Sequence, residues 1–568
     1  MEARATPIQR ILDSNVQLIV PIFQREYSWE IEQIKTLWED ILKVYEYNYN
    51  IKAKDHDEIS HFLGPIVRSE IPSSSVDIRR TYMIDGQQRI ITIMVFLSAI
   101  RNRMRHLNDS IARKIDYMYL LNIEEEDENR FKLRPSEADR DNFTKILLGK
   151  TNLTDSPLKE CFDFINNELD TREDLDLEKL RAIIVRNLIL VNIDVGSNEN
   201  PYFIFESLNA KGLLLTQPDL IRNYVFMKIP SESRQIELFR KYWHPMQMEL
   251  KEEIDSFFWQ YSRLDGELTR KERTYRNLKF ELEPHDNGSI EKKLQHIKQF
   301  AQYHSRIINP DNEEIPEIRT RLRRYRQWDV KSSPHPFILN VYDDLNSGRI
   351  SQNEFCEILD IIESFIVRRS LSKRPSNQLN KLLIPLYQKV DKSNFVPSLQ
   401  KVLLLDWPDD LEFIAGFKTQ NIYRSGINRT RLILESLENY FEHKEPVNYF
   451  SESIQIEHIL PQAGRKVENL TPEWKQMLGS DYRGVYNKYL HTIGNLTLTG
   501  YNSEASKKPF EDKKRIYEES HFEINKYFRD VTTWNQEEIE ARAEYLARIA
   551  VRIWRHPKGN MNLFLDYK

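Results

Sequence analysis

The sequence predicts an α+β protein in which helices predominate. Glycine is scarce, with 16 residues in 568, and long stretches rich in Leu, Ile, Glu, Lys and Arg repeat their apolar residues at helical spacing. Strand-like stretches occur only in the first 200 residues and again after about residue 450. The length exceeds what one hydrophobic core supports, so we expect about two to four units.

Charge and cysteine content narrow the functional class only a little. Lys and Arg number 82 and Asp and Glu 87, and the net charge of −5 neither shows nor excludes a nucleic-acid surface. Cys161 and Cys356 form no CxxC pair, and we expect both to be reduced thiols without a zinc or disulfide role. No apolar run approaches the roughly 18 residues of a membrane span, and the start MEARATPIQRILD has no apolar signal segment. We therefore expect a cytoplasmic protein that contacts no membrane.

The first expected unit, residues 1–230, mixes strands with helices. Strand-like stretches occur at residues 17–23, 61–69, 80–85 and 188–195. Helical spacing occurs at residues 31–45, 89–104, 200–209 and 217–228. Ser28 is expected to cap the first of these helices, because a serine hydroxyl accepts a hydrogen bond from the first helical turn.

The second expected unit, residues 231–425, is a helical scaffold, because strand signals fade there. Its densely charged stretch at residues 263–277 predicts a mobile surface loop. The stretch RTRLRRYRQW, residues 319–328, mixes Arg with Tyr and Trp, which fits either a solvated helix face or a surface that contacts DNA. The same two alternatives apply to Arg368 and Arg369.

The third expected unit, residues 426–568, contains the first candidate site. The stretch SIQIEHILPQAG places His458 after Glu457 near the end of an expected strand that a proline stops. Downstream, IGNLTLT predicts a second strand, and the residues around Phe510 predict a helix. Strand, long loop, strand and helix in this order are typical of a ββα metal finger.

These residue types suit phosphodiester hydrolysis. A neutral imidazole such as His458 activates water, and a hard cation held by oxygen ligands neutralises the phosphoryl charge. Glu457 offers a carboxylate oxygen, and Asn495 or Asn502 offers an amide oxygen. Three lysines are candidates for contact with the DNA backbone: Lys507, Lys508 and Lys513. The alternative is a structural histidine, because a single Glu-His pair in a strand is more often part of a core.

The C-terminal motifs IEHILPQ, IGNLTLT and YNS resemble those of the HNH-type (His-Me finger) nuclease domain of GmrSD-type restriction enzymes, which are type IV and modification-dependent. The resemblance covers about residues 425 to 568. It implies that His458 is the catalytic base and that Mg²⁺ or Mn²⁺ is the metal. Further catalytic residues implied are Asn495, Asn502 and Lys513, and the implied metal ligands are Glu457, His458 and Asn502.

The chain departs from that family in one place, because it has SKKPF where many relatives carry S-N before the phenylalanine. His491 stands just before the IGNLTLT motif, and we expect it to be structural.

The stretch MIDGQQRIITI, residues 83–93, forms the second candidate site. A strand is expected to end at Asp85, Gly86 permits a tight turn, and Gln87, Gln88 and Arg89 open a helix. Amide donors, a guanidinium and a helix N-terminus together suit an anionic phosphate. The alternative is an ordinary first helical turn in which Arg89 is solvated or paired with an acid.

This second stretch resembles the signature of the ParB/sulfiredoxin-like domain of GmrSD-type enzymes. PIFQREYSW, LGPI and FESLNAKGLLLTQPDLIRN accompany it, and the resemblance covers about residues 1 to 230. It implies that the DGQQR residues bind and hydrolyse a nucleotide. Further candidates for the same pocket are Gln24, Arg25, Asn209, Lys211 and Gly212. PIFQREYSW also fits a simpler role, in which its aromatic residues fasten the following helix.

Together the two resemblances imply a nucleotide-responsive, divalent-metal-dependent DNA endonuclease of anti-phage defence that cleaves modified double-stranded phage DNA. The nucleotide is GTP, UTP or ATP, and the sequence leaves open which of these binds and whether the chain forms a homodimer. One alternative is a nucleotide-gated DNA-binding adaptor with a degenerate nuclease domain. Another is an enzyme whose main output is NTP hydrolysis.

Overall fold

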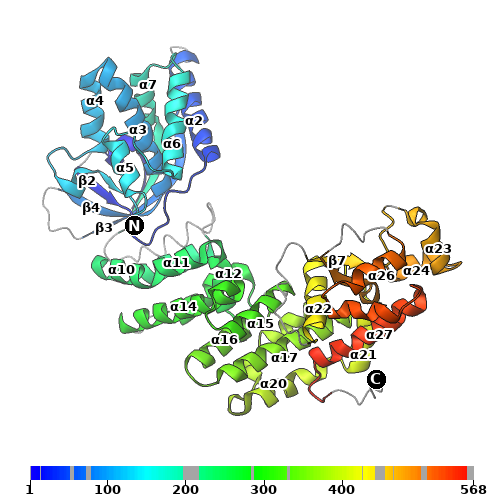
Figure 1. The fold of residues 1–568 in the computed structure, drawn as a ribbon. Coiled ribbons are helices and arrows are strands. Elements are labelled where there is room, and N and C mark those ends of the chain that lie inside the picture. The colour runs from blue at the N-terminus through cyan, green and yellow to red at the C-terminus, as the bar shows by residue number, and fades with distance from the viewer. Residues whose placement is uncertain are drawn as a thin grey trace. The chain divides into compact units, whose positions relative to one another are not determined.

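The computed structural model describes residues 2–12, 15–51, 57–71, 78–195, 216–229, 231–282, 287–328, 333–424, 426–441, 454–464, 466–500 and 508–559 (Figure 1). Several sequence predictions lie outside these residues: Asn209, Lys211, Gly212, Asn502, Lys507 and the helix expected at 200–209. The chain divides into two compact units, residues 1–245 with 275–294 and residues 246–274 with 295–568. The boundaries expected at residues 230 and 425 stay predictions. Within the described residues, no helix is both long and apolar enough to cross a membrane.

Among its described residues, the first unit contains a six-stranded mixed sheet with the order β1-β6-β3-β4-β2-β5. The strands are β1 (Glu2–Pro7), β2 (Val16–Ile19), β3 (His61–Glu70), β4 (Arg79–Asp85), β5 (Leu133–Arg134) and β6 (Leu188–Val195). β3 pairs with β6 in parallel and with β4 in antiparallel orientation, and β2 lies parallel to β4. The four strands expected in this part of the chain are confirmed. The first of them was expected at residues 17–23 and is shorter. It ends at Ile19, two residues before Pro21.

Helices cover both faces of this sheet. On one face Ile66 belongs to the main core around α3 (Gln87–Leu107), whose side chains are buried nearly all round. On the other face Val67 packs with Leu220 of α9 (Gln217–Met227). Ile66 and Val67 face opposite ways because successive strand residues alternate between the two faces. The helices predicted at 89–104 and 217–228 are therefore confirmed as the two that enclose the sheet.

The remaining helices of this unit include α2, whose span confirms the helix expected at 31–45 (Figure 1). They are α1 (Ile8–Leu12), α2 (Ile31–Glu46), α4 (Asp109–Ile115), α5 (Arg140–Leu147), α6 (Pro157–Thr171), α7 (Leu177–Ala182), α10 (Glu232–Leu238), α11 (His244–Leu250) and α13 (Thr274–Glu281), the last two crossing a unit boundary. The expectation that Ser28 caps α2 is wrong. Glu30 is the N-cap and forms a capping box with Gln33, while the N–H of Ser28 donates to Gln88 Oε1 (2.8 Å).

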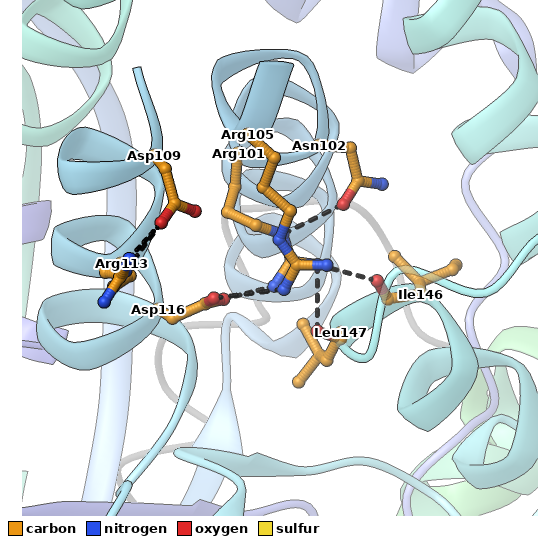
Figure 2. A network of polar contacts seen from close by, with 8 residues as sticks. All are labelled: Arg101, Asn102, Arg105, Asp109, Arg113, Asp116, Ile146 and Leu147. Carbon is orange, nitrogen blue, oxygen red and sulfur yellow. Dashed lines mark hydrogen bonds and ion pairs between the residues drawn. The ribbon is translucent and has the colours of Figure 1, made fainter. Parts of the chain in front are cut away.

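A buried arginine ties α3 to the rest of the first unit. Figure 2 shows the guanidinium of Arg101, which has no exposed surface, between Asp116 and the end of α5. It forms an ion pair with Asp116 and donates to the carbonyl oxygens of Ile146 (3.2 Å) and Leu147 (2.9 Å). Burial lowers the pKa of Arg101, and Asp116 opposes that shift. The charge is therefore held inside the unit by one carboxylate and two carbonyl dipoles.

The first part of the second unit is helical, as expected for a scaffold. Its helices are α12 (Ile254–Tyr261), α14 (Asn287–Ile308, which begins in the first unit), α15 (Pro316–Gln327), α16 (His335–Asn346), α17 (Gln352–Leu371), α18 (Leu379–Leu383), α19 (Leu386–Lys389), α20 (Phe395–Leu403), α21 (Asp410–Thr419) and α22 (Ile427–Asn439). The stretch at 263–277 is not simply a surface loop. Arg263 is buried against the ring of Trp259, Lys271–Arg273 forms a 3₁₀ turn, and α13 starts at Thr274.

Two arginines of the arginine-rich helix α15 form ion pairs with acidic residues of the same unit. Arg321 binds Asp360 (3.0 Å) and Arg324 binds Glu363 (2.7 Å), and both acids lie on α17. Tyr325 and Trp328 are buried, so neither forms the exposed stacking surface that one interpretation of the sequence required.

The solvated alternative is also wrong for two arginines of α17. Arg368 is fully buried and binds Asp410 (2.7 Å), and Arg369 is buried as well. Both guanidinium groups can be buried because each donates hydrogen bonds to an acidic side chain or a carbonyl oxygen in the protein interior.

The last part of the second unit carries a two-stranded sheet, β7 (Gln455–His458) with β8 (Leu496–Thr499), among its described residues. Between the strands the chain forms α23 (Pro472–Leu478) and α24 (Tyr482–Tyr489), where a long loop was expected. The helices α26 (Phe510–Glu518) and α27 (Gln536–Ile553) follow, and α26 confirms the helix predicted around Phe510. Aromatic residues such as Trp474, Phe510 and Trp534 form the core between them.

Candidate active site

His458 is the last residue of β7, and the pairing with β8 fixes its place. The strands run antiparallel, with Glu457 opposite Thr497 and His458 opposite Leu496. Because neighbouring strand residues alternate between faces, the side chains of Glu457 and His458 leave β7 on opposite sides. The two residues expected to share one metal ion therefore have different surroundings.

The His458 ring is bonded on both of its nitrogen atoms. Its Nε2 lies 3.1 Å from Nδ1 of His491, and its Nδ1 lies 3.0 Å from the amide nitrogen of Gln462. Tyr423 meets the His458 ring edge-on, with ring centres 4.6 Å apart, and stacks on His491 in nearly parallel planes. The expectation of a merely structural His491 therefore missed its direct contact with the candidate base.

Burial makes His458 neutral. The pKa of the imidazole falls from 6.5 to about 3, first because burial disfavours the charged ring, and then because a positive charge on His491 or on Lys513 would oppose a second one nearby. His458 is only 5% exposed, whereas Gln462 is exposed and His491 is half-buried. The Nδ1 edge of the ring therefore faces the exposed side chain of Gln462, while the Nε2 edge faces the half-buried side chain of His491.

Glu457 and Lys513 form a buried ion pair. Nζ of Lys513 lies 2.6 Å from Oε1 of Glu457 and donates to the carbonyl oxygen of His458 at 2.6 Å. Burial raises the pKa of Glu457 and lowers that of Lys513, and each partner opposes the other's shift. Lys513 thus fastens α26 to the end of β7, and it holds the backbone of the candidate base. The structure gives it no exposed surface with which to meet a DNA backbone.

Asn495 supports the turn that follows His458. Its Oδ1 accepts from the N–H of Leu460 (2.7 Å) and from Nε1–H of Trp534 (3.1 Å). Its amide nitrogen donates to the carbonyl oxygens of Leu460 (3.2 Å) and Leu490 (2.9 Å). Asn495 has no exposed surface, so its amide serves the protein backbone in this structure.

Helix α27 holds the turn Ile493–Asn495 from behind. A side chain at Gly494 would place its Cβ 2.3 Å from the carbonyl oxygen of Ile539, so only glycine lets α27 approach this closely. Arg542 of the same helix is fully buried and donates to the carbonyl oxygens of Gly494 (2.9 Å) and Leu496 (2.7 Å). Burial lowers the pKa of Arg542 to about 10. Its positive charge faces carbonyl dipoles on the same turn that carries Asn495.

The expected metal ligands do not form a complete set in the described residues. No group of three or more His, Cys, Asp or Glu side chains there is placed to hold a metal ion. Glu457 is bound to Lys513, and both nitrogen atoms of His458 have partners. Asn502, the third expected ligand, lies outside the described residues. The described side chains therefore do not fit a cation site by themselves.

At the second candidate site, Asp85 ends β4 and Gly86 turns the chain into α3. Gly86 has φ of +94°, and a Cβ there would lie 2.4 Å from Cγ2 of Ile66, so the position requires glycine. Asp85 is half-buried. Burial raises the pKa of its carboxyl, while Arg89, the N–H of Gly86 and Arg25 act against this shift. A carboxylate at the start of α3 therefore interacts electrostatically with two guanidinium groups.

Other residues of the motif brace this turn. Gln88 donates to the carbonyl oxygen of Glu26 (3.0 Å), and Gln24 donates to that of Ile84 (3.2 Å). Arg89 donates to the carbonyl oxygen of Pro65 (2.8 Å). Gln87 is buried in the first turn of α3. The structure thus brings the described motif residues together with Gln24 and Arg25. Several of them fix the segment of residues 23–26 against the sheet.

Sequence reasoning missed Arg222 of α9. This arginine is buried and pairs with Asp219 (2.7 Å), and electrostatic interaction links it to both Arg25 and Glu26. Its Nε has no hydrogen-bond partner in the described part of the chain. The signal was present in the stretch QPDLIRN, which was noted as a helix without a role for its arginine.

Two family models match this chain. The model for the GmrSD restriction endonuclease N-terminal domain matches residues 8–226, and that for the GmrSD restriction endonucleases C-terminal domain matches residues 407–549. The chain belongs to the GmrSD restriction endonucleases. In this GmrSD-family chain, Asp85 lies in the N-terminal match and His458 in the C-terminal match, which also includes Tyr423. No curated protein matches the chain by sequence. Membership in the GmrSD family gives the chain the role of a restriction endonuclease, an enzyme that binds and cuts DNA.

Proposed function

We propose that the chain is a nucleotide-responsive endonuclease that cleaves modified double-stranded phage DNA, with His458 as its general base. The observation that carries the proposal is the His458 ring, which is neutral, fixed at the end of β7 and bonded at Nδ1 to the exposed Gln462. This ring lies inside the match to a restriction endonuclease domain.

The proposed step is the attack of water on a phosphodiester. Nδ1 of His458 takes a proton from the water, the water oxygen forms a bond to phosphorus, and one P–O ester bond breaks. The leaving oxygen keeps the electron pair of that bond and takes up a proton from solvent. A neutral imidazole is available at physiological pH because its pKa is about 3 in the free protein. The negative charge of a bound phosphodiester favours the protonated imidazolium, so substrate binding raises the basicity of His458 when it is needed.

The expected dependence on Mg²⁺ or Mn²⁺ remains part of the proposal on the strength of the sequence resemblance alone. The described side chains do not make up a cation site, and the water step above does not pass through a metal. Cleavage with added Mg²⁺, with added Mn²⁺ and with a chelator measures this dependence directly.

Nucleotide control is proposed for the DGQQR site of the first unit. The N-terminus of the long helix α3 favours negative charge, and Arg25 interacts electrostatically with Asp85 there. Arg25 is half-buried and is not used as a brace in the described structure, so it is the best candidate to meet a phosphate. Replacement of Arg25 by Ala should weaken the binding of GTP, UTP or ATP, while the exposed Arg10→Ala serves as the control.

The first test is cleavage of unmodified plasmid and of heavily modified phage DNA by wild type and His458→Ala. The exposed His521 supplies a matched control, because His521→Ala removes a histidine from the same unit without touching the site. We expect wild type and His521→Ala to cut modified DNA, and His458→Ala to lose at least about 10²-fold in rate. Equal cutting by His458→Ala and wild type would overturn the assignment. No cutting by the wild type under any condition would favour the adaptor alternative.

A further inference from the structure

We propose that His491 is a positioning residue that holds the ring of His458 in the Nε2–H tautomer, so that Nδ1 keeps a lone pair for the attacking water. This inference rests on the proposed function of His458. It assigns a role to a histidine that the sequence motifs leave outside the catalytic set.

The proton positions follow from the partner of Nδ1. The amide nitrogen of Gln462 faces Nδ1 of His458 at 3.0 Å, and an amide nitrogen donates but does not accept. Nδ1 of His458 must therefore accept, which puts the ring proton on Nε2. That proton points at Nδ1 of His491, 3.1 Å away, which accepts it. His491 in turn carries its own proton on Nε2.

The two edges of the His458 ring differ in how firmly they are held. Gln462 is exposed and reaches the ring with a long side chain, so its amide can leave without disturbing the fold. Three contacts hold His491, one to its ring and two to its backbone carbonyl. Its ring stacks on Tyr423 with an interplanar angle of 6°, and its carbonyl oxygen accepts from the N–H of Ile422 (3.1 Å) and of Tyr423 (3.5 Å). The Nε2 edge is thus anchored and the Nδ1 edge can be opened.

This arrangement gives His491 a function during the reaction. When the amide of Gln462 gives way to water, Nδ1 of His458 takes the proton and the ring becomes an imidazolium. The Nε2–H of that cation continues to donate to Nδ1 of His491, and a hydrogen bond from a charged donor is stronger than one from a neutral donor. His491 therefore stabilises the protonated base while it stays neutral itself. The water oxygen keeps the electron pair with which it attacks phosphorus.

The kinetic test compares two replacements of His491. In His491→Leu the acceptor is gone, and in His491→Asn the Oδ1 takes nearly the place of Nδ1. We expect His491→Leu to lower kcat for cleavage of DNA by tenfold or more with KM changed by less than about twofold, because the acceptor acts on the reacting base. His491→Asn should recover most of kcat. Wild-type kcat in His491→Leu would overturn the proposal, as would an equal loss in His491→Asn when both variants are folded.

A second measurement reads the tautomer without any cleavage. Long-range ¹H–¹⁵N correlation spectra of full-length protein with ¹⁵N-labelled histidine, assigned with His458→Ala, distinguish the protonated from the unprotonated ring nitrogen. We expect Nε2–H at His458 in the wild type and a shift towards Nδ1–H in His491→Leu. Nδ1–H in the wild type would overturn the inference. A wild type that cuts no DNA would defeat the proposed function while this spectrum still decides the tautomer, and a wild-type rate in His491→Leu would defeat only the inference.

Discussion

Nζ of Lys513 lies 2.6 Å from Oε1 of Glu457, and the two side chains expose 0% and 6% of their surface. A buried pair of this kind costs desolvation on both sides, and it tolerates the loss of both partners better than the loss of one. The pair joins β7 to α26. An intact ion pair therefore helps to hold His458 in place.

We therefore predict that Lys513→Met lowers the free energy of unfolding by about 3 to 5 kcal/mol, because it leaves the Glu457 carboxylate buried without a cation. Chemical denaturation at neutral pH measures this loss. Lys526→Met is the control, because it removes a lysine from the half-exposed pair with Glu523 and should cost at most about 1 kcal/mol. The double variant Glu457→Met/Lys513→Met should recover part of the loss. A Lys513→Met protein as stable as the control variant would contradict the prediction.

Asn495→Ala should lower the stability of the fold more than it lowers the rate of DNA cleavage by folded protein. The change leaves the N–H of Leu460 and the indole N–H of Trp534 without their acceptor inside the core, at a cost of about 1 to 3 kcal/mol for each group. Thermal unfolding and cleavage rates measured well below the unfolding temperature separate the two effects. We expect a clear fall in Tm and, in the cold, a cleavage rate far above that of His458→Ala. A variant of wild-type stability without activity would instead make Asn495 a catalytic residue.

The buried Arg101 predicts a contrast with its neighbour Arg105. Both contact Asp116, but the side chain of Arg101 is fully buried and that of Arg105 is 44% exposed. Arg101→Met should cost about 3 to 5 kcal/mol, because Asp116 and two carbonyl groups of α5 lose their main cation. Arg105→Met should cost at most about 1 kcal/mol. Urea denaturation of the two variants checks this, and equal losses would show that the Figure 2 network is not a structural anchor.

His458 also predicts how acid affects the fold. Its pKa is about 3 in the folded chain and near 6.5 when unfolded, so between these values the unfolded chain binds the proton more readily. The stability that His458 contributes is complete above pH 6.5 and is lost as the pH falls towards 3. From pH 7 to pH 5 the wild type should lose about 2 kcal/mol more than His458→Gln, since each pH unit is worth at most about 1.4 kcal/mol. His521→Gln, at an exposed position of the same unit, is the control for replacing a histidine by glutamine. Parallel stability curves for wild type and His458→Gln would contradict this.

Local patterns predicted the elements well where one physical signal dominates. The stretch 188–195 is largely apolar and rich in β-branched residues, and it forms β6 at those residues. The cap of α2 was missed because Ser28 is the commoner capping residue, whereas Glu30 and Gln33 satisfy the first turn together. Arg368 and Arg369 were expected on a surface because their acceptors, such as Asp410, come from a different helix that spacing alone does not reveal.

The sequence predicted which residues belong to the candidate site. It did not predict which of them bond to each other. His458 and Lys513 stand in recognisable motifs, but the contact of Lys513 with Glu457 joins residues 56 positions apart. His491 could have been found by one argument. The antiparallel pairing of β7 and β8 brings the residues just before β8 close to the end of β7, where His458 lies.

The close approach of α27 to Gly494 has a consequence for how the enzyme is made. The carbonyl groups that Arg542 binds belong to the turn beside His458, yet Arg542 comes later in the chain than every candidate residue of the cutting site. On a ribosome, which releases the chain from its N-terminus, the histidine emerges before the helix that shapes its surroundings. An interrupted translation product that ends between α26 and α27 would lack this support. Incomplete synthesis would therefore leave the host with an inactive fragment and not with an unregulated nuclease.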